Sequence, residues 1–193
     1  MQIEVYVTQP PERQLSQQVA HILVAGLWSS DKTKLIRHVS DTPLESVNVA
    51  EDFLPVKMPD LLMGEMKVDD RLTAHVWGAP KDWRHDYVNY LVNIKTILLN
   101  RGDHHRMMGM IIVVDSLRSA SSEDEGKLVR LVQSDWHLPY FIVASHPHEP
   151  YARHPETIRA DYHIHPDVPI LPYDISQATE AKRAMIELMY RAM

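Results

Sequence analysis

The chain has 193 residues, of which 45% are hydrophobic and 24% are charged, proportions that are typical of one globular domain. It has no cysteine, which excludes disulfide scaffolds, zinc–thiolate centres, iron–sulfur clusters and cysteine nucleophiles. The net charge of −6 argues against a nucleic-acid binder, because neutralising phosphates requires a clustered excess of Lys and Arg. Since no apolar run approaches the roughly 18 residues of a membrane span and residues 1–14 have no signal-peptide core, we expect a cytoplasmic protein.

Strand-length apolar runs alternate with longer periodic segments along the chain, which is typical of crossover units around a mostly parallel sheet. In chain order, the pattern first predicts a buried strand, a helix and a long loop, at residues 19–25, 32–40 and 41–59. Two strands follow, at residues 61–68 and 72–77. Because a hairpin turn at Asp69-Asp70 joins them directly, these two strands should be antiparallel.

The second half of the chain continues the alternation. A long helix is expected over residues 83–100, with Gly102 just beyond its end. Strands and helices then alternate again, at residues 107–114, 122–135, 140–144, 155–161, 168–171 and from 177 onward. Together the elements predict a three-layer α/β domain over residues 19–193, with helices on both faces of a mostly parallel sheet of about six strands, one of them antiparallel.

Residues 1–18 precede this domain as an N-terminal extension. Ile3, Val5 and Val7 alternate with polar residues, as in an edge strand, whereas Pro10-Pro11 separates them from the first core strand. An added strand or hairpin and a loosely docked tail are both compatible with this pattern.

The segment GLWSSDKT at residues 26–33 follows the first strand and precedes a helix. It matches the phosphate-binding pattern G-x-x-x-x-G-K-S/T except that Asp31 stands at the second glycine. Such a loop binds phosphates because backbone N–H groups and the helix N-terminus surround them. The alternative is a plain strand-to-helix turn in which Asp31 is the N-cap, so that its carboxylate satisfies those N–H groups itself.

With the segments LTAHVWGAP and MIIVVDS, the order of elements resembles the Ras-like small GTPases, especially their bacterial branch, over about residues 19–193. The resemblance implies that Lys32 holds the terminal phosphates and that Thr33 ligates magnesium. The nucleotide-binding positions that it marks in this chain are Gly26, Asp31, Lys32, Thr33, Gly78, Ser145 and His146.

Several of these positions depart from the pattern that the resemblance implies. Asp31 adds a carboxylate beside the phosphates, and at about 5 Å and an effective dielectric of about 20 each such like-charge contact costs about 3 kcal/mol. Lys81 and Asp82 replace the glycine that meets the terminal phosphate and the glutamine that orients the attacking water. Residues 43–72 contain no threonine for magnesium, and Glu149 lies one place beyond the expected base-reading aspartate.

These departures predict a degenerate small GTPase-like protein, a pseudo-GTPase that acts as a protein-interaction or regulatory scaffold with weak or absent GTP binding and no cofactor. The motifs for GTP hydrolysis are missing, so we assign no catalytic residue. The alternative is a divergent, active GTP-binding switch that uses Lys32 and Thr33 with GTP or GDP and magnesium.

The helix expected over residues 83–100 carries a second apolar stripe beside its core-facing arc. The stripe is explained either by cover from the protein's own loops or by a surface for a protein partner or a second copy of the chain. Under the second reading, the candidate partner-binding residues are Trp83, Val88 and Val92.

The chain has 12 histidines, several of them close together in the second half. A neutral imidazole is a common metal ligand, but no ligand pattern such as H-E-x-x-H occurs. We therefore expect exposed loop histidines and no metal site. Ser116, which follows Asp115, has no nucleophile-elbow glycines, and this argues against a Ser/His/Asp arrangement.

Overall fold

The structure, a computed structural model, describes residues 18–26, 29–47, 60–78, 93–98, 105–118, 123–135 and 137–192. In chain order the elements are β1 (Gln18–Ala25), α1 (Ser29–Val39), β2 (Glu45–Val47), β3 (Leu61–Lys67), β4 (Leu72–Gly78), β5 (His105–Asp115), α3 (Glu123–Asp135), β6 (Tyr140–Ser145), α4 (Pro155–Tyr162), β7 (Ile170–Leu171) and α5 (Ala178–Ala192). Residues 93–98 are also helical. Among these described residues, every helix falls short of the length or hydrophobicity needed to cross a membrane.

The strands form one seven-stranded sheet in the order β2-β3-β4-β1-β5-β6-β7. Strand β3 is antiparallel to both of its neighbours, and the pairs from β4 through β7 are all parallel. The expected mostly parallel sheet with one antiparallel strand is therefore confirmed. The seventh strand is β2, which lies inside the predicted loop of residues 41–59; it has three residues, too few for a hydrophobic pattern, and pairs with the edge of β3.

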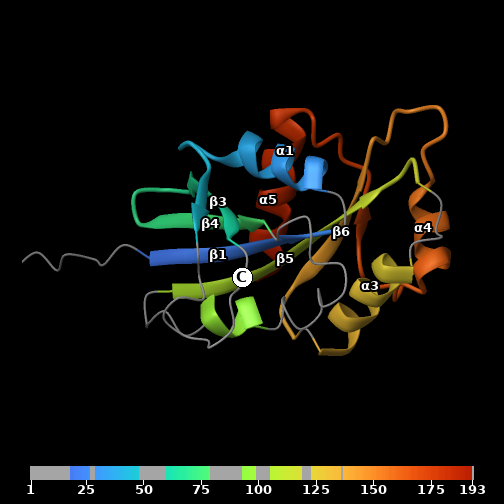
Figure 1. Cartoon of the computed structure of the whole chain (residues 1–193), viewed down its shortest axis with the longest axis horizontal. Helices are drawn as coiled ribbons and strands as arrows, with labels where there is room; N and C mark the ends of the chain where they lie inside the picture. The colour runs from blue at the N-terminus through green and yellow to red at the C-terminus, as the bar shows by residue number, and fades with distance from the viewer. Residues whose placement is uncertain are drawn as a thin grey trace, which may run out of the picture.

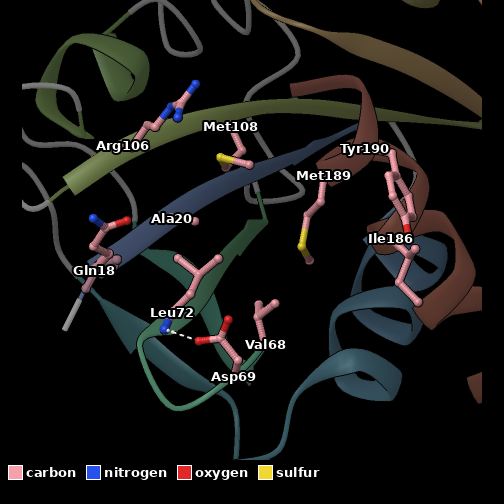
Figure 2. Close-up of a pocket in the computed structure, with 11 residues that line it drawn as sticks. Gln18, Ala20, Val68, Asp69, Leu72, Arg106, Met108, Ile186, Met189 and Tyr190 are labelled. Atoms are coloured by element: carbon pink, nitrogen blue, oxygen red, sulfur yellow. Dashed lines mark hydrogen bonds between the residues drawn. The ribbon is translucent and has the colours of Figure 1, made fainter. Parts of the chain in front are cut away.

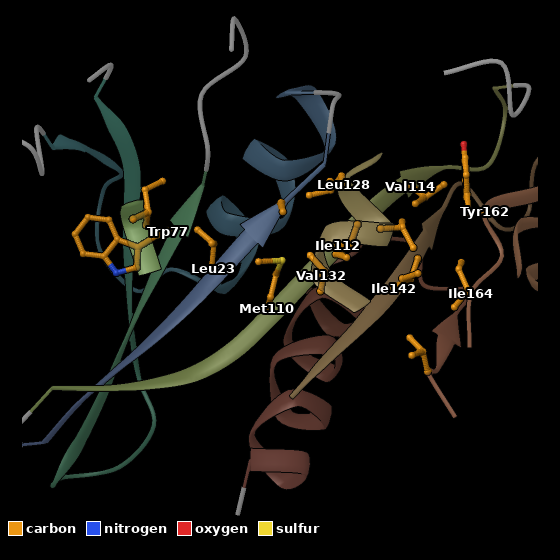
Figure 3. Close-up of a cluster of buried hydrophobic side chains, with 14 of the residues drawn as sticks. Leu23, Trp77, Met110, Ile112, Val114, Leu128, Val132, Ile142, Tyr162 and Ile164 are labelled. Carbon is orange, nitrogen blue, oxygen red and sulfur yellow. The ribbon is translucent and has the colours of Figure 1, made fainter. Parts of the chain in front are cut away.

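Helices cover both faces of the sheet (Figure 1). Helices α1 and α5 pack on one face, while α3, α4 and residues 93–98 contribute to the core on the other. Successive side chains of a strand point to opposite faces, so β1 supplies Leu23 and Ala25 to one core and Ile22 and Val24 to the other. Figure 3 shows the first of these cores, in which Leu23 lies near Met110 and the α3 side chains reach the β5 and β6 strands. The central strand is thus covered on both sides, as its continuous apolar sequence predicts.

Most predicted boundaries agree with the structure within a few residues. The hairpin turn is confirmed, because the Asp69 carboxylate accepts the backbone N–H groups of Arg71 and Leu72 at 2.7 and 2.8 Å. The last strand is shorter than expected, residues 170–171 instead of 168–171. The N-terminal extension up to residue 17 and most of the predicted helix at 83–100 lie outside the described residues, so these two assignments remain predictions.

The main difference is the start of α1. The helix begins at Ser29, three residues before the predicted start, so Asp31 is not its N-cap. Instead Asp31 lies in the first helical turn, where the helix macrodipole favours a negative charge. The Asp31 carboxylate does not cap the helix. It contacts residues of other elements instead, as described below.

A glycine sets the register between β1 and β5. The pairing shifts between His21 and Ile22, whose partners are Met107 and Gly109, so one residue of β5 is left over, as in a β-bulge. Gly109 has a φ of 157°, and a Cβ at this position would lie 2.2 Å from the carbonyl oxygen of Pro139. The backbone of β5 therefore approaches its neighbour more closely than any side chain permits.

We expect Gly109→Ala to lower the free energy of unfolding by about 2–3 kcal/mol, because backbone atoms must move to admit the methyl group. The matched control is Gly126→Ala in α3, where the added Cβ would meet only the end of the Arg130 side chain, at 3.1 Å. That control should raise the stability by up to about 1 kcal/mol, since alanine favours helix more than glycine does. Urea unfolding followed by circular dichroism measures both changes; equal effects of the two variants would contradict the assignment.

Candidate functional site

The segment that resembles a phosphate loop lies at the carboxyl edge of the parallel strands. Gly26 follows the last residue of β1, and Asp115 pairs with Ser145 where β5 and β6 end. Because parallel strands end at the same edge, the residues after β1, β5 and β6 meet there, and ligands of open α/β sheets bind at such an edge. This edge is the candidate site.

The loop itself is short. With α1 beginning at Ser29, the N–H of Thr33 is donated within the helix to the carbonyl of Ser29, so it is not directed at a ligand. Gly26 has a φ of 139°, and a Cβ there would lie 2.4 Å from the carbonyl oxygen of Val113. Glycine at position 26 is thus required by the close approach of β5, whatever the site binds.

Asp31 is the centre of the site. Its side chain is 4% exposed, and its Oδ2 atom accepts a hydrogen bond of 2.9 Å from the hydroxyl of Ser145. The Nε2 atom of His146 lies 3.2 Å from the same oxygen, and the Lys34 ammonium lies 3.7 Å from Oδ1. A buried carboxylate requires partners of this kind. These contacts, which we call the Asp31 latch, join the start of α1 to the end of β6.

Lys32, next to the latch, is also buried, with only 2% of its surface exposed. Its ammonium donates a hydrogen bond to the carbonyl of Gly26. Burial lowers the pKa of the Lys32 ammonium to about 8, because desolvation disfavours the charged form. At neutral pH the side chain still carries a positive charge, and it lies beside the Asp31 latch.

The end of β5 adds a second carboxylate to the site. Oxygens of Asp115 accept the backbone N–H of Leu117 and the Nε–H of Arg118, each at 3.0 Å. Asp31, Asp115 and His146 each have one atom, a carboxylate oxygen or a ring nitrogen, that lies within 4.8 Å of the corresponding atoms of the other two. His146 adopts a left-handed backbone conformation, with a φ of 57°, at the point where the chain turns away from β6.

Arg153 connects the segment after β6 to the end of β5 and to α4. Its backbone N–H donates to the carbonyl of Ser116 at 2.8 Å, and its guanidinium donates to the carbonyl of Asp115 at 3.1 Å. The guanidinium also pairs with Asp161 of α4 at 3.0 Å. The segment that follows His146 is therefore fixed to the end of β5, and this holds Asp115 and His146 near each other.

The structure separates the positions marked by the family resemblance. Gly26, Asp31, Lys32, Ser145 and His146 come together at the site, with Thr33 in the helix behind them. Gly78 lies at the end of β4 beside Val24 of β1, where a Cβ would lie 2.4 Å from Ile36 of α1; its absence of a side chain lets α1 pack on the sheet.

The remaining predicted positions have no structural test. Lys81, Asp82, Trp83, Val88 and Val92 lie outside the described residues. The sequence pattern assigns no role to Asp115. Its place at the end of a buried strand is the signal that could have marked it as a site residue.

A cavity of about 570 Å³ lies at the opposite end of β1 (Figure 2). Its walls come from the start of β1, the β3–β4 turn and the last turns of α5, and they include Met108, Met189 and Tyr190. No residue that lines it belongs to the Asp31 latch. The cavity is therefore separate from any chemistry at the loop.

No protein-family model and no curated protein matches the chain, but solved structures do. The cytosolic domain of the T. maritima FeoB iron transporter in a GDP form matches with a TM-score of 0.60 and 14% identity, over 91% of this chain and 64% of that one. The G domain of the same transporter gives a TM-score of 0.57 and 14% identity, over 89% of this chain and 99% of that one. A variant of Aquifex aeolicus Era bound to GDP and AlF4− gives 0.59 and 12%, over 91% and 57%.

At these identities the similarity concerns the fold. This chain has the Ras-like, P-loop fold of GTPase domains, as its sequence predicted, and it spans about two thirds of the length of the FeoB cytosolic domain, 64%.

The buried lysine gives a pH test of the site. Because the pKa of Lys32 is about 8 in the folded protein and 10.5 in the reference state, the unfolded chain binds more protons, and the folded protein gains stability as the pH rises between these values. Lys32→Met removes the buried charge. Its free energy of unfolding, relative to that of the wild type, should therefore fall by about 3 kcal/mol between pH 7 and pH 10.5. Urea unfolding at a series of pH values measures the difference.

The control for this test is Lys182→Met, which removes an exposed ammonium on α5, outside the Asp31 latch. A difference between Lys32→Met and the wild type that stays constant over the whole pH range would show that Lys32 is not buried as described.

Proposed function

We propose that this chain is a degenerate small GTPase-like protein, a pseudo-GTPase that acts in the cytoplasm as a protein-interaction or regulatory scaffold with weak or absent GTP binding. The observation that supports the proposal is the Asp31 latch. It places a buried carboxylate, held by Ser145 and His146, at the position where a phosphate loop has a glycine.

Electrostatics oppose a nucleotide at this position. A carboxylate about 5 Å from a phosphate charge costs about 3 kcal/mol at an effective dielectric of about 20, which corresponds to roughly a hundredfold in affinity. Lys32 offsets part of this cost, but its ammonium is buried and its pKa is lowered to about 8. The ammonium is therefore less strongly protonated than an exposed lysine, and it already donates to the Gly26 carbonyl.

The latch also opposes a nucleotide sterically. To admit a triphosphate, Asp31 must leave Ser145, and breaking a buried hydrogen bond of this kind costs about 1–3 kcal/mol. In addition, α1 already begins at Ser29, so the part of the phosphate-loop segment from residue 29 onward is helical. Both features support weak or absent binding of a magnesium nucleotide.

One observation favours the alternative of an active GTP-binding switch. Lys32 and Thr33 are both present at the start of the helix that follows β1, and solved structures of the same fold are described in GDP and GMPPNP forms. Under this alternative, Lys32 would hold phosphates and Thr33 would ligate magnesium.

We expect GTP and GDP with magnesium to bind weakly or not at all in calorimetric titration. Asp31→Gly should improve the affinity, by up to about a hundredfold if the charge term dominates. Asp31→Asn is the matched variant for the charge, since it removes the negative charge and keeps a side chain of the same size. It should give nearly the same gain if the charge term dominates, and a much smaller one if the side chain itself blocks the loop. A submicromolar dissociation constant of the wild-type protein for either nucleotide, or phosphate release clearly above that of Lys32→Ala, would establish the alternative.

The scaffold part of the proposal rests on the apolar stripe of the segment 83–100. We expect Trp83→Glu and Val92→Glu to leave the melting temperature nearly unchanged and to abolish self-association or partner capture, because a few buried aromatic and aliphatic anchors carry most interface energy. The control is Tyr151→Glu, which changes a side chain that is 89% exposed elsewhere on the molecule. Sedimentation and thermal denaturation measure both properties; unfolding of both variants would place these residues in the core.

A further inference from the structure

We infer that Asp31, Asp115 and His146 form a binding site for a divalent transition-metal ion, and that zinc suits it best. The three side chains come from the start of α1, the end of β5 and the residue after β6, and one donor atom of each lies within 4.8 Å of the others. The inference names a ligand for the same site as the proposed function, and it rests on the part of that proposal in which the loop is closed to nucleotide.

The distances are close to those of a zinc site. Two ligand atoms bound tetrahedrally to one zinc ion at about 2.0–2.1 Å are about 3.4 Å apart. The Oδ2 atom of Asp31 and the Nε2 atom of His146 are already 3.2 Å apart. The other separations are at most 4.8 Å, so a change of about 1.4 Å or less completes the geometry. Asp115 lies at a strand end, and the Arg118 side chain that donates to it is about half exposed, so this contact can yield to an ion.

The charges in the site also favour a cation. Two carboxylates and one imidazole converge, and Asp31 is almost fully buried. The positive side chains near them include Lys34, 3.7 Å from Asp31, and Arg118, 3.0 Å from Asp115. The buried Lys32 and the guanidinium of Arg153, which donates to the Asp115 carbonyl, also lie close by. The side chains of Lys34 and Arg118 are about half exposed, so solvent weakens their attraction. A divalent ion between the carboxylates would compensate both charges directly.

Hydrogen bonds from outside the three ligands orient them. The hydroxyl of Ser145 donates to Asp31, and the backbone N–H of Leu117 donates to Asp115. Outer-shell donors of this kind fix the direction of a carboxylate and are part of most metal sites. In the proposed site these hydrogen bonds would hold the two carboxylates while the ligand atoms move toward the ion.

The donor set selects the kind of metal. An imidazole nitrogen suits zinc, copper and nickel, whereas magnesium prefers six oxygen ligands in a near-ideal octahedron. Three protein ligands leave one tetrahedral position for water. The proposed ion is therefore different in ligands and chemistry from the magnesium that accompanies a nucleotide.

Zinc alone, titrated calorimetrically into chelator-treated full-length protein without nucleotide, tests the inference. We expect one site of micromolar or tighter affinity, weakened by at least about tenfold in His146→Ala and in Asp115→Asn. His148→Ala is the matched control, because it removes an exposed histidine two residues away and should leave that site unchanged. Since the chain has 12 histidines, the comparison among variants, and not binding by itself, is the decisive result.

A second readout is the melting temperature, which zinc should raise in the wild type and in His148→Ala and leave unchanged in the two ligand variants, because a ligand that binds only the folded state stabilises it. Circular dichroism without metal establishes that each variant is folded. Equal zinc affinity of all four proteins, or stabilisation by magnesium and not by zinc, would overturn the inference.

The outcomes separate this inference from the proposed function. Nucleotide is titrated into metal-free protein in a separate experiment. Loss of the zinc result alone would remove the metal site and leave the pseudo-GTPase proposal in place. Submicromolar nucleotide binding would remove both, because the loop would then be open.

Discussion

The arrangement of the candidate site depends on one buried charge. A carboxylate removed from water costs several kcal/mol unless it is paired or hydrogen-bonded, and Asp31 meets this requirement through Ser145 and His146. Ser145, the last residue of β6, lies 114 residues away in the sequence, and His146 follows it. The position of α1, the end of β6 and the direction in which the chain leaves the sheet are therefore coupled. Any change at Asp31 acts on all three.

Most of the fold could be predicted from the sequence, because long apolar runs and helical periodicity report burial directly. The hairpin at Asp69 and the strand of residues 18–25 are examples, since each has a local signal. Strand β2 and the start of α1 could not be predicted in this way. Glu45–Val47 is short and polar and is a strand only because the edge of β3 is available to it. Ser29 and Ser30 have no apolar side chain that would mark them as the start of a helix.

The sequence could predict which residues form the candidate site, but not which of them contact one another. The phosphate-loop pattern marks Gly26, Asp31 and Lys32, and the place after the next-to-last strand marks Ser145 and His146. Nothing in their spacing says that Asp31 and Ser145 are hydrogen-bonded to each other, because this depends on how β1 and β6 are ordered in the sheet. The glycine at position 26 needs no phosphate contact to explain it, since the close approach of β5 already requires a residue without a side chain there.

The same substitution that opposes an anion at this loop favours a cation. In a phosphate loop the helix N-terminus, the backbone N–H groups and a lysine all present positive charge to one point. Here a carboxylate enters the first turn of the helix, the lysine is buried and its pKa is lowered to about 8, and Asp115 adds a second negative charge from the neighbouring strand. These changes bring two carboxylates to the edge of the sheet at which ligands of this fold bind. The proposed cation site therefore uses the same edge that a phosphate loop uses for an anion.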